Sequence, residues 1–313
     1  ISPVRAESPV VVPVTAADRS GAGPLWATLR GSFDLEIGTI QWGLYRIDRV
    51  TGRLDAGDRS LSLRNLGGEM FSGRWGGDVR VDHDPANEAG SHRLQADFRI
   101  EQFESARVIQ TAFRNQIASI DARLDLRASV SGLGDTLPGL VDRSEAQFAL
   151  ESENGVMRLA VPKSDRLATA AVFGGSVLLS PELRALGRLL RKFAEMPVDR
   201  LTIGGRRTAA GEISLDQFRF DSPQVSLLGH GRVAALANEP LMNRPLELSL
   251  QLAAKDELAV ILGGMKLLEK TPAPNGFRAM RQSVILGGRA GEPDTSPLYD
   301  LLAKAVSGSR GTW

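Results

Sequence analysis

Strict alternation of apolar and polar residues recurs along most of this chain. One clear run places its apolar side chains at every second position, at Leu94, Ala96, Phe98 and Ile100. The other runs begin at Phe33, Leu61, Val79, Leu124 and Leu246. Side chains of a β-strand point to opposite faces in turn, so this period predicts strands with one apolar and one polar face.

Turn signals separate neighbouring runs, as expected of antiparallel hairpins. Asn154-Gly155 lies between two runs, and Asn-Gly favours a two-residue hairpin turn because both residues accept a positive φ. Weaker turn signals are VTGR at 50–53, NLGG at 65–68 and TAAGE at 208–212. Regular strand–helix–strand alternation is missing. The sequence therefore predicts a mainly β (α+β) fold, with a long antiparallel sheet.

Glycine pairs interrupt the strands. The chain has 33 glycines in 313 residues, and the stretch LRNLGGEMFSGRWGGDVRV from Leu63 to Val81 holds two pairs. The pairs are Gly67-Gly68, Gly76-Gly77, Gly174-Gly175, Gly204-Gly205, Gly263-Gly264 and Gly287-Gly288. Glycine inside a strand marks a bulge, a bend or a close backbone approach. We therefore expect a sheet that curls, and its apolar face is either a closed core or an open trough.

Four segments have helical spacing of apolar residues. They are 105–120, 180–196, 256–270 and 296–306. The clearest begins with Ser180 as an N-cap and Pro181 in the first turn. We expect one domain over 25–308 that contains all four helices, preceded by a linker or lead-in strand at 1–24 and followed by a tail at 309–313.

Composition excludes several classes of site. The 38 basic and 37 acidic residues balance, which gives no electrostatic case for nucleic acid. Without cysteine there is no disulfide, thiol nucleophile or zinc–thiolate site. No phosphate-binding loop, dinucleotide fingerprint or catalytic-serine motif is present, and the carboxylates are scattered. His83 and His92 lie in a polar stretch that we interpret as a hairpin loop. We therefore expect no enzyme, no metal and no cofactor.

The predicted helix at 180–196 carries a basic face. Its cations are Arg184, Arg188, Arg191 and Lys192. Such a face is typical of a helix that lies on an anionic lipid surface. An ordinary amphipathic helix that covers the end of a sheet has the same pattern, so both interpretations stay open.

Several blocks of the chain resemble the AsmA-like family of bacterial envelope proteins. The likeness is one of strand, glycine and helix order, and it spans about 25–306. It is carried by LRNLGGEMFSGRWGGDVRV at 63–81, FRIEQFESARVIQTAF at 98–113, the block from 120 to 161, EISLDQFRFDSPQVSLLGHGRVAAL at 212–236 and VILGGRAGEPDTSPLYDLL at 284–302. In the 120–161 block a strand ending in Ser-Gly is followed by a short helical turn and a hairpin.

The resemblance implies a function that composition does not. Members are anchored in the inner membrane of diderm bacteria and extend into the periplasm, and their curved β-groove is thought to carry phospholipids toward the outer membrane. The family offers no catalytic residues to transfer. This chain departs from the family in lacking an N-terminal anchor, and its start resembles a piece of a longer polypeptide. We therefore expect a periplasmic segment whose membrane anchor lies outside this chain.

Alternating aliphatic residues are the candidates for lining such a groove. They are Leu94, Phe98, Ile100, Leu124, Leu126, Leu246, Leu248 and Leu250. The same residues could fill a closed core beneath the helices. A second interpretation of the chain is a structural or assembly factor for outer-membrane proteins that acts through a strand edge.

Overall fold

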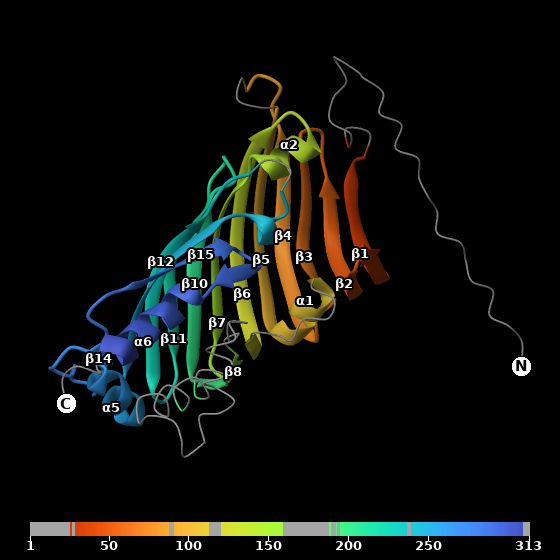
Figure 1. The fold of residues 1–313 in the computed structure, drawn as a ribbon. Helices are drawn as coiled ribbons and strands as arrows, with labels where there is room; N and C mark the ends of the chain where they lie inside the picture. The colour runs from red at the N-terminus through yellow and green to blue at the C-terminus, as the bar shows by residue number, and fades with distance from the viewer. Residues whose placement is uncertain are drawn as a thin grey trace, which may run out of the picture.

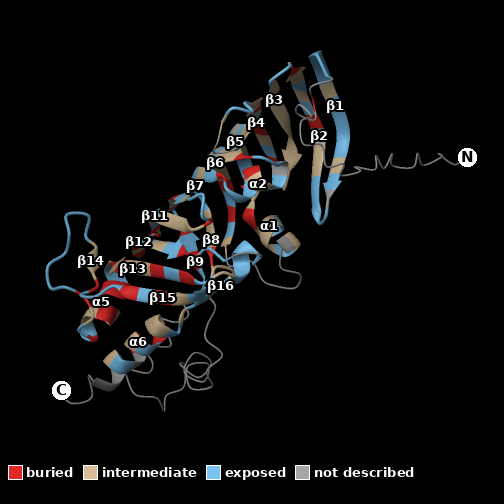
Figure 2. Cartoon of the chain, turned by 90° about the horizontal axis from the view of Figure 1, so that it is seen from above, coloured by how far each residue is buried: buried red, intermediate tan, exposed pale blue. Residues whose placement is uncertain are grey.

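The computed structural model describes residues 26, 29–87, 91–112, 120–158, 188, 192, 195–236 and 239–308. Its strands dominate, and the helices lie on one face of the sheet, which we call the inner face (Figures 1 and 2). The strands are β1 Gly31–Trp42, β2 Tyr45–Ala56, β3 Ser60–Met70, β4 Gly73–His83, β5 His92–Glu104, β6 Ile120–Gly134, β7 Glu145–Ser152, β8 Gly155–Met157, β9 Met196–Val198, β10 Arg200–Arg207, β11 Ile213–Asp221, β12 Val225–Val233, β13 Leu246–Ala254, β14 Arg278–Ala279, β15 Val284–Arg289 and β16 Glu292–Asp294. The helices are α1 Ser105–Ala112, α2 Leu137–Asp142, η1 Leu241–Asn243, α5 Asp256–Gly264 and α6 Ser296–Gly308.

One open antiparallel sheet of 16 strands forms a curved groove. Its order is β1-β2-β3-β4-β5-β6-β7-β10-β11-β12-β13-β15-β16, with β8, β9 and β14 paired off this path. Most neighbours in space are thus neighbours in sequence, because short connections favour antiparallel pairing. The prediction of a mainly β fold with a long, curved antiparallel sheet is confirmed.

Alternation separates the two faces of each strand. In β5, Ala96 is buried and Phe98 and Ile100 are half-buried, whereas Gln95 and Arg99 are exposed. The opposite, outer face carries rows of ion pairs between arginines and carboxylates along and across the strands. Examples are Arg80–Asp82 at 2.8 Å and Arg219–Asp221 at 2.6 Å. The outer face is thus polar and the apolar side chains gather on the inner face.

The glycine-rich stretch lies in adjacent strands at a region of bulges and close approach. Gly67 pairs with Gly76 across β3 and β4, and Gly68 pairs with Trp75. The register of this strand pair shifts between Leu63 and Leu66, at a β-bulge. A Cβ on Gly68 would lie 2.5 Å from Trp75 Nε1, so the indole needs a glycine beside it. The expected bends and close approach are therefore found, and the stretch forms no phosphate-binding loop.

Several predicted turns are wrong. VTGR lies inside β2 and NLGG lies inside β3, where the glycines accompany irregular pairing instead of chain reversal. Asn154-Gly155 does not close a hairpin, because β7 and β8 run on in one direction along β6 and do not pair with each other. Neither residue of this Asn-Gly pair has the positive φ that a type I′ turn requires. TAAGE at 208–212 does connect paired strands, β10 and β11.

The helix predictions hold in part. The predicted helix 105–120 includes α1 at Ser105–Ala112, while 113–119 lie outside the described residues and Ile120 belongs to β6. The predicted helix 256–270 ends at Gly264, because the glycine pair is a poor helix former and Leu268 instead bridges to Met280. The last helix runs from 296 to 308. The short helical turn implied by the family resemblance is α2, which Thr136 caps through its hydroxyl to the Gly139 amide.

Most of the helix predicted at 180–196 lies outside the described residues, as do the segments 1–24 and 309–313. Arg188 and Lys192 are helical, but Met196 is the first residue of β9. The C-terminal half of the sheet forms the main core, where α5 and α6 lie over β12, β13 and β15 (Figure 2). Fully buried side chains there are Phe220, Leu258, Leu262, Tyr299 and Leu302.

Candidate functional site

Rows of apolar side chains cross the inner face from strand to strand. Register places them side by side without a polar interruption over most of the sheet. One row is Gly77, Phe98, Ala128, Phe148, Gly205, Leu215, Gly231, Leu248 and Leu286. The next is Trp75, Ile100, Leu126, Leu150, Ile203, Phe218, Gly229, Leu250 and Val284. These rows form a continuous apolar floor.

Glycines in this floor lie beneath bulky neighbours. The Phe148 ring covers Gly205, where an added Cβ would lie 2.8 Å from Phe148 Cζ. Leu250 covers Gly229 in the same way, at 2.6 Å from its Cδ2. Large side chains can therefore fold down across the neighbouring strand instead of standing upright. This arrangement smooths the floor and accounts for glycines that sequence analysis could only assign to bends.

The C-terminal half of the floor is covered. Leu246 and Leu248 are buried in the main core, and Leu250 contributes to a cavity of about 40 Å³ that Leu298 of α6 closes. Leu124 is also buried, together with Phe103 and Ala122. Of the predicted lining residues, these four therefore lie in or against the closed core.

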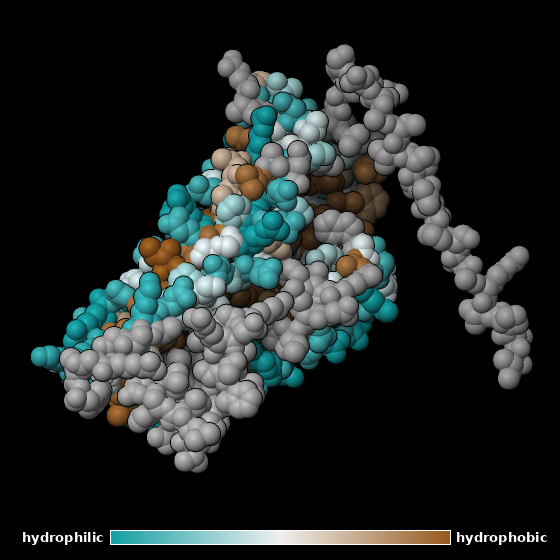
Figure 3. Space-filling view, in the orientation of Figure 1, coloured by the Kyte–Doolittle hydropathy of each residue, from teal (hydrophilic) through white to brown (hydrophobic). Residues whose placement is uncertain are grey.

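The N-terminal half of the floor is open. Phe33 and Ile37 of β1 are 44% and 40% exposed although they lie on the apolar face. Phe98 is half-buried and packs against neither buried cluster, which makes it the predicted residue best placed on the open floor. Figure 3 shows hydrophobic side chains gathered in a hollow near the N-terminal edge of the sheet.

Three predicted lining residues mark the boundaries of this open region. Leu94 packs against a small cluster formed by Trp26, Val81 and Leu140 of α2. Ile100 and Leu126 are half-buried and pack against the edge of the main core. The open region therefore lies between α2 on one side and the main core on the other.

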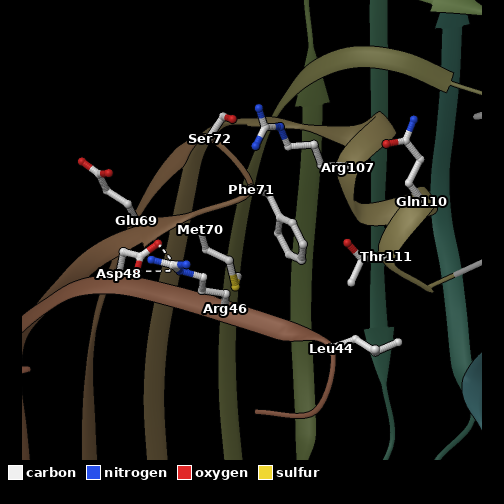
Figure 4. A pocket seen from close by; sticks show the side chains of 10 residues that line it. All are labelled: Leu44, Arg46, Asp48, Glu69, Met70, Phe71, Ser72, Arg107, Gln110 and Thr111. Carbon is white, nitrogen blue, oxygen red and sulfur yellow. Dashed lines mark hydrogen bonds and ion pairs between the residues drawn. The ribbon is translucent and has the colours of Figure 1, made fainter. Parts of the chain in front are cut away.

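A mixed pocket of about 710 Å³ adjoins the open floor at the ends of β2 and β3 (Figure 4). The side chains of Leu44, Met70 and Phe71 supply its apolar part. Its polar part comes from β2, β3, the turn after β3 and α1, through Arg46, Asp48, Glu69, Ser72, Arg107, Gln110 and Thr111. An apolar wall beside charged groups suits an amphiphile better than a purely polar ligand.

The turn that carries Phe71 has an uncommon backbone. Phe71 and Ser72 have φ values of 52° and 65°, a left-handed conformation that Phe rarely adopts. Its carbonyl accepts a hydrogen bond from the Glu104 amide at 3.0 Å, and its ring meets Tyr45 edge-on at 6.0 Å. These contacts fix the ring in the pocket. This turn was not predicted from the sequence, because it contains neither Asn nor Gly at its centre.

The charges of the pocket are already paired. Arg46 Nε lies 2.9 Å from Asp48 Oδ1, and Arg107 Nε lies 2.7 Å from Glu104 Oε2. Hydrogen bonds from Thr39 and Arg46 lower the pKa of Asp48, which keeps this carboxylate ionised. The rim is therefore zwitterionic rather than cationic.

The predicted membrane-surface residues are only partly placed. Arg184 and Arg191 lie outside the described residues. Arg188 is exposed, whereas Lys192 Nζ lies 2.8 Å from Glu257 Oε2 and 3.1 Å from Gln224 Oε1. The hydrogen bond and charge of Lys192 lower the pKa of Glu257. Lys192 is thus paired with α5 through Glu257, and the lipid-surface role of this basic face stays a prediction.

The two histidines of the predicted hairpin loop are neighbours in the sheet. His83 pairs with His92 across β4 and β5, and their ring centroids are 4.7 Å apart. Burial and the nearby His83 lower the pKa of His92. Within the described ranges, no group of three or more histidine or carboxylate side chains could hold a metal ion.

Comparisons with known proteins add no relative. Protein-family models, curated proteins and solved structures gave no match to this chain. Among the described helices, none has both the length and the apolar character needed to cross a bilayer. The AsmA-like resemblance therefore stays a prediction that depends on sequence pattern.

Proposed function

We propose that the open half of the groove binds lipid acyl chains. The supporting observation is the apolar inner face of the N-terminal strands, where Phe33, Ile37 and Phe98 belong to neither described hydrophobic cluster. The described helices α5 and α6 cover the same face farther along the sheet. Monomeric proteins rarely leave so regular an apolar face to water, and such a face marks a binding surface. Each methylene that leaves water contributes about 0.8 kcal/mol, so a single acyl chain supplies ample binding free energy.

The two faces of the sheet have different roles in this proposal. Acyl chains lie on the inner face, and the paired charges of the outer face remain in water. The pocket around Phe71 lies where a lipid head group would leave the floor. Both signs of charge meet there, which suits a phospholipid with a zwitterionic head group.

The wider role follows the family resemblance. We propose a non-catalytic, periplasmic segment of an inner-membrane-anchored AsmA-like protein of a diderm bacterium. It carries phospholipid between the inner and outer membranes, with the anchor outside this chain. An assembly role toward outer-membrane proteins, through a strand edge, is the alternative prediction.

A charge on the open floor tests lipid binding. Phe98→Glu places a carboxylate among the apolar rows, and Gln95→Glu places the same group on the exposed outer face of the same strand. Protein purified from membranes is assayed for bound phospholipid by mass spectrometry and titrated with a fluorescent phospholipid. We expect Gln95→Glu to retain lipid and Phe98→Glu to lose it.

Folding must be checked in both variants by circular dichroism, since Phe98 also lies against Gly77. Val79→Glu provides a second floor variant at a half-buried position in β4. The proposal fails if the native chain carries no lipid. It also fails if folded Phe98→Glu and Val79→Glu bind lipid as well as the native chain.

A further inference from the structure

The two ends of the sheet differ in how they are protected. β16 at the C-terminal end has three residues, and Pro293 removes one of its backbone donors. β1 at the N-terminal end has 12 residues with neither proline nor lysine, and its only described partner is β2. Natural sheets shorten, charge or cover such an edge to prevent pairing with other chains. β1 lacks the devices that protect β16.

The exposed side chains of β1 continue the apolar floor. Phe33 pairs with Leu54, and this apolar row continues through Leu63 and Val79. Ile37 pairs with the buried Val50. An added strand with apolar residues at alternate positions would cover their exposed sides. It would also extend the floor without a change of register.

The outer face of β1 breaks a charge pattern of the other strands. Interior strands repeat an arginine, an apolar residue and a carboxylate, with the two charges paired. The pairs are Arg53–Asp55, Arg80–Asp82, Arg99–Glu101 and Arg219–Asp221. β1 has Asp34-Leu35-Glu36 in the equivalent arrangement. Within the described part of the chain, neither acid forms an ion pair or a side-chain hydrogen bond.

We propose that the free edge of β1 receives a β-strand of a partner protein in which apolar and basic residues alternate. The apolar residues would continue the floor beside Phe33 and Ile37, and the basic residues would pair with Asp34 and Glu36. Opposite charges on cross-strand neighbours stabilise such a pair, and like charges oppose it. A second copy of this chain would bring the same carboxylates together, which disfavours self-pairing. This inference does not depend on lipid binding.

A charge exchange tests the proposal with the full chain. The probes are two synthetic peptides of the length of β1, one alternating isoleucine with arginine and the other alternating isoleucine with glutamate. Binding is measured by fluorescence anisotropy. The arginine peptide places two opposite charges beside Asp34 and Glu36, whereas the glutamate peptide places two like charges there. We therefore expect the arginine peptide to bind about tenfold more tightly.

The variant Asp34→Arg with Glu36→Arg should reverse this preference. Glu36→Arg alone, opposite the uncharged Thr51, is the milder variant if the double change unfolds the chain. Glu145→Arg is the matched control, since Glu145 is exposed on the outer face of β7, away from the edge. It should leave the preference unchanged.

Three results would overturn the proposal. The first is a peptide preference that the charge exchange leaves unchanged. The second is that neither peptide binds. The third is slow hydrogen exchange at the outward amides of β1 in the protein alone, which would mean that the edge is already filled. If sedimentation then gives a dimer, a second copy of the chain fills the edge.

Discussion

Gly77→Ala and Gly67→Ala form a matched pair that tests the register of the glycine-rich strands. Both glycines have ordinary negative φ values, so alanine suits the backbone at either position. The surroundings differ. A Cβ on Gly77 would press on the Asp97 carbonyl oxygen and lie 3.0 Å from Phe98 Cδ1, whereas a Cβ on Gly67 would have 3.7 Å to its nearest neighbours.

The magnitudes follow from these distances. The Asp97 carbonyl belongs to the adjacent strand, so relief at position 77 requires a shift of backbone and not of a flexible side chain. Such overpacking costs about 1–3 kcal/mol of the free energy of unfolding. At position 67 the loss of backbone freedom in the unfolded chain is the main effect, and it stabilises by about 0.4–1 kcal/mol.

Thermal unfolding followed by circular dichroism measures both changes. With about 2 °C per kcal/mol for a chain of this size, Tm should fall by about 2–6 °C in Gly77→Ala and rise by about 1–2 °C in Gly67→Ala. Equal Tm values for the two variants would refute the reasoning, because they would mean that Gly77 does not lie beneath Phe98.

Two further predictions concern polar groups of the fold. Ser105→Ala removes a buried hydroxyl that accepts a hydrogen bond from the Ala122 amide and contacts the carbonyls of Ile120 and Ala122. Urea unfolding should show that the free energy of unfolding falls by about 1–3 kcal/mol. A fall of less than about 0.5 kcal/mol would contradict this role. The pKa of His92 is lowered from 6.5 in the folded chain, so below that pH the unfolded state binds the proton more readily and stability falls. Tm should therefore fall between pH 7.5 and 5.5, and His92→Asn should make this fall smaller. A Tm that does not change with pH would exclude the lowered pKa of His92 as a cause of pH-dependent stability.

Periodicity predicted the sheet well because the chain repeats one local rule. Leu94, Phe98 and Ile100 alternate in sequence and share one face in the structure. The predicted turns were less successful, since a glycine signals either a turn or a close approach and the local sequence does not distinguish them. Gly52 and Gly67 belong to strands, while Phe71 occupies the centre of a tight turn.

The apolar character of the candidate site was predictable from the sequence, but its position on the sheet was not. Phe98 and Leu248 follow the same alternation and even share one row across the sheet, yet one lies on the open floor and the other in the core. Alternation reports which face of a strand is apolar. It carries no information about what lies over that face, because the covering helices come from segments far away in sequence.

The lengths of the connections explain why one half of the floor is open. Gly43 and Leu44 alone separate β1 from β2, and Phe71 and Ser72 alone separate β3 from β4. Strands of 11 or 12 residues are about 36–40 Å long at 3.3 Å per residue, and a turn of two residues cannot fold back across them. The described helices all follow later strands, where longer connections return over the sheet. Loop length therefore distinguishes the open strands from the covered ones, and it can be read from the sequence once the true turns are known.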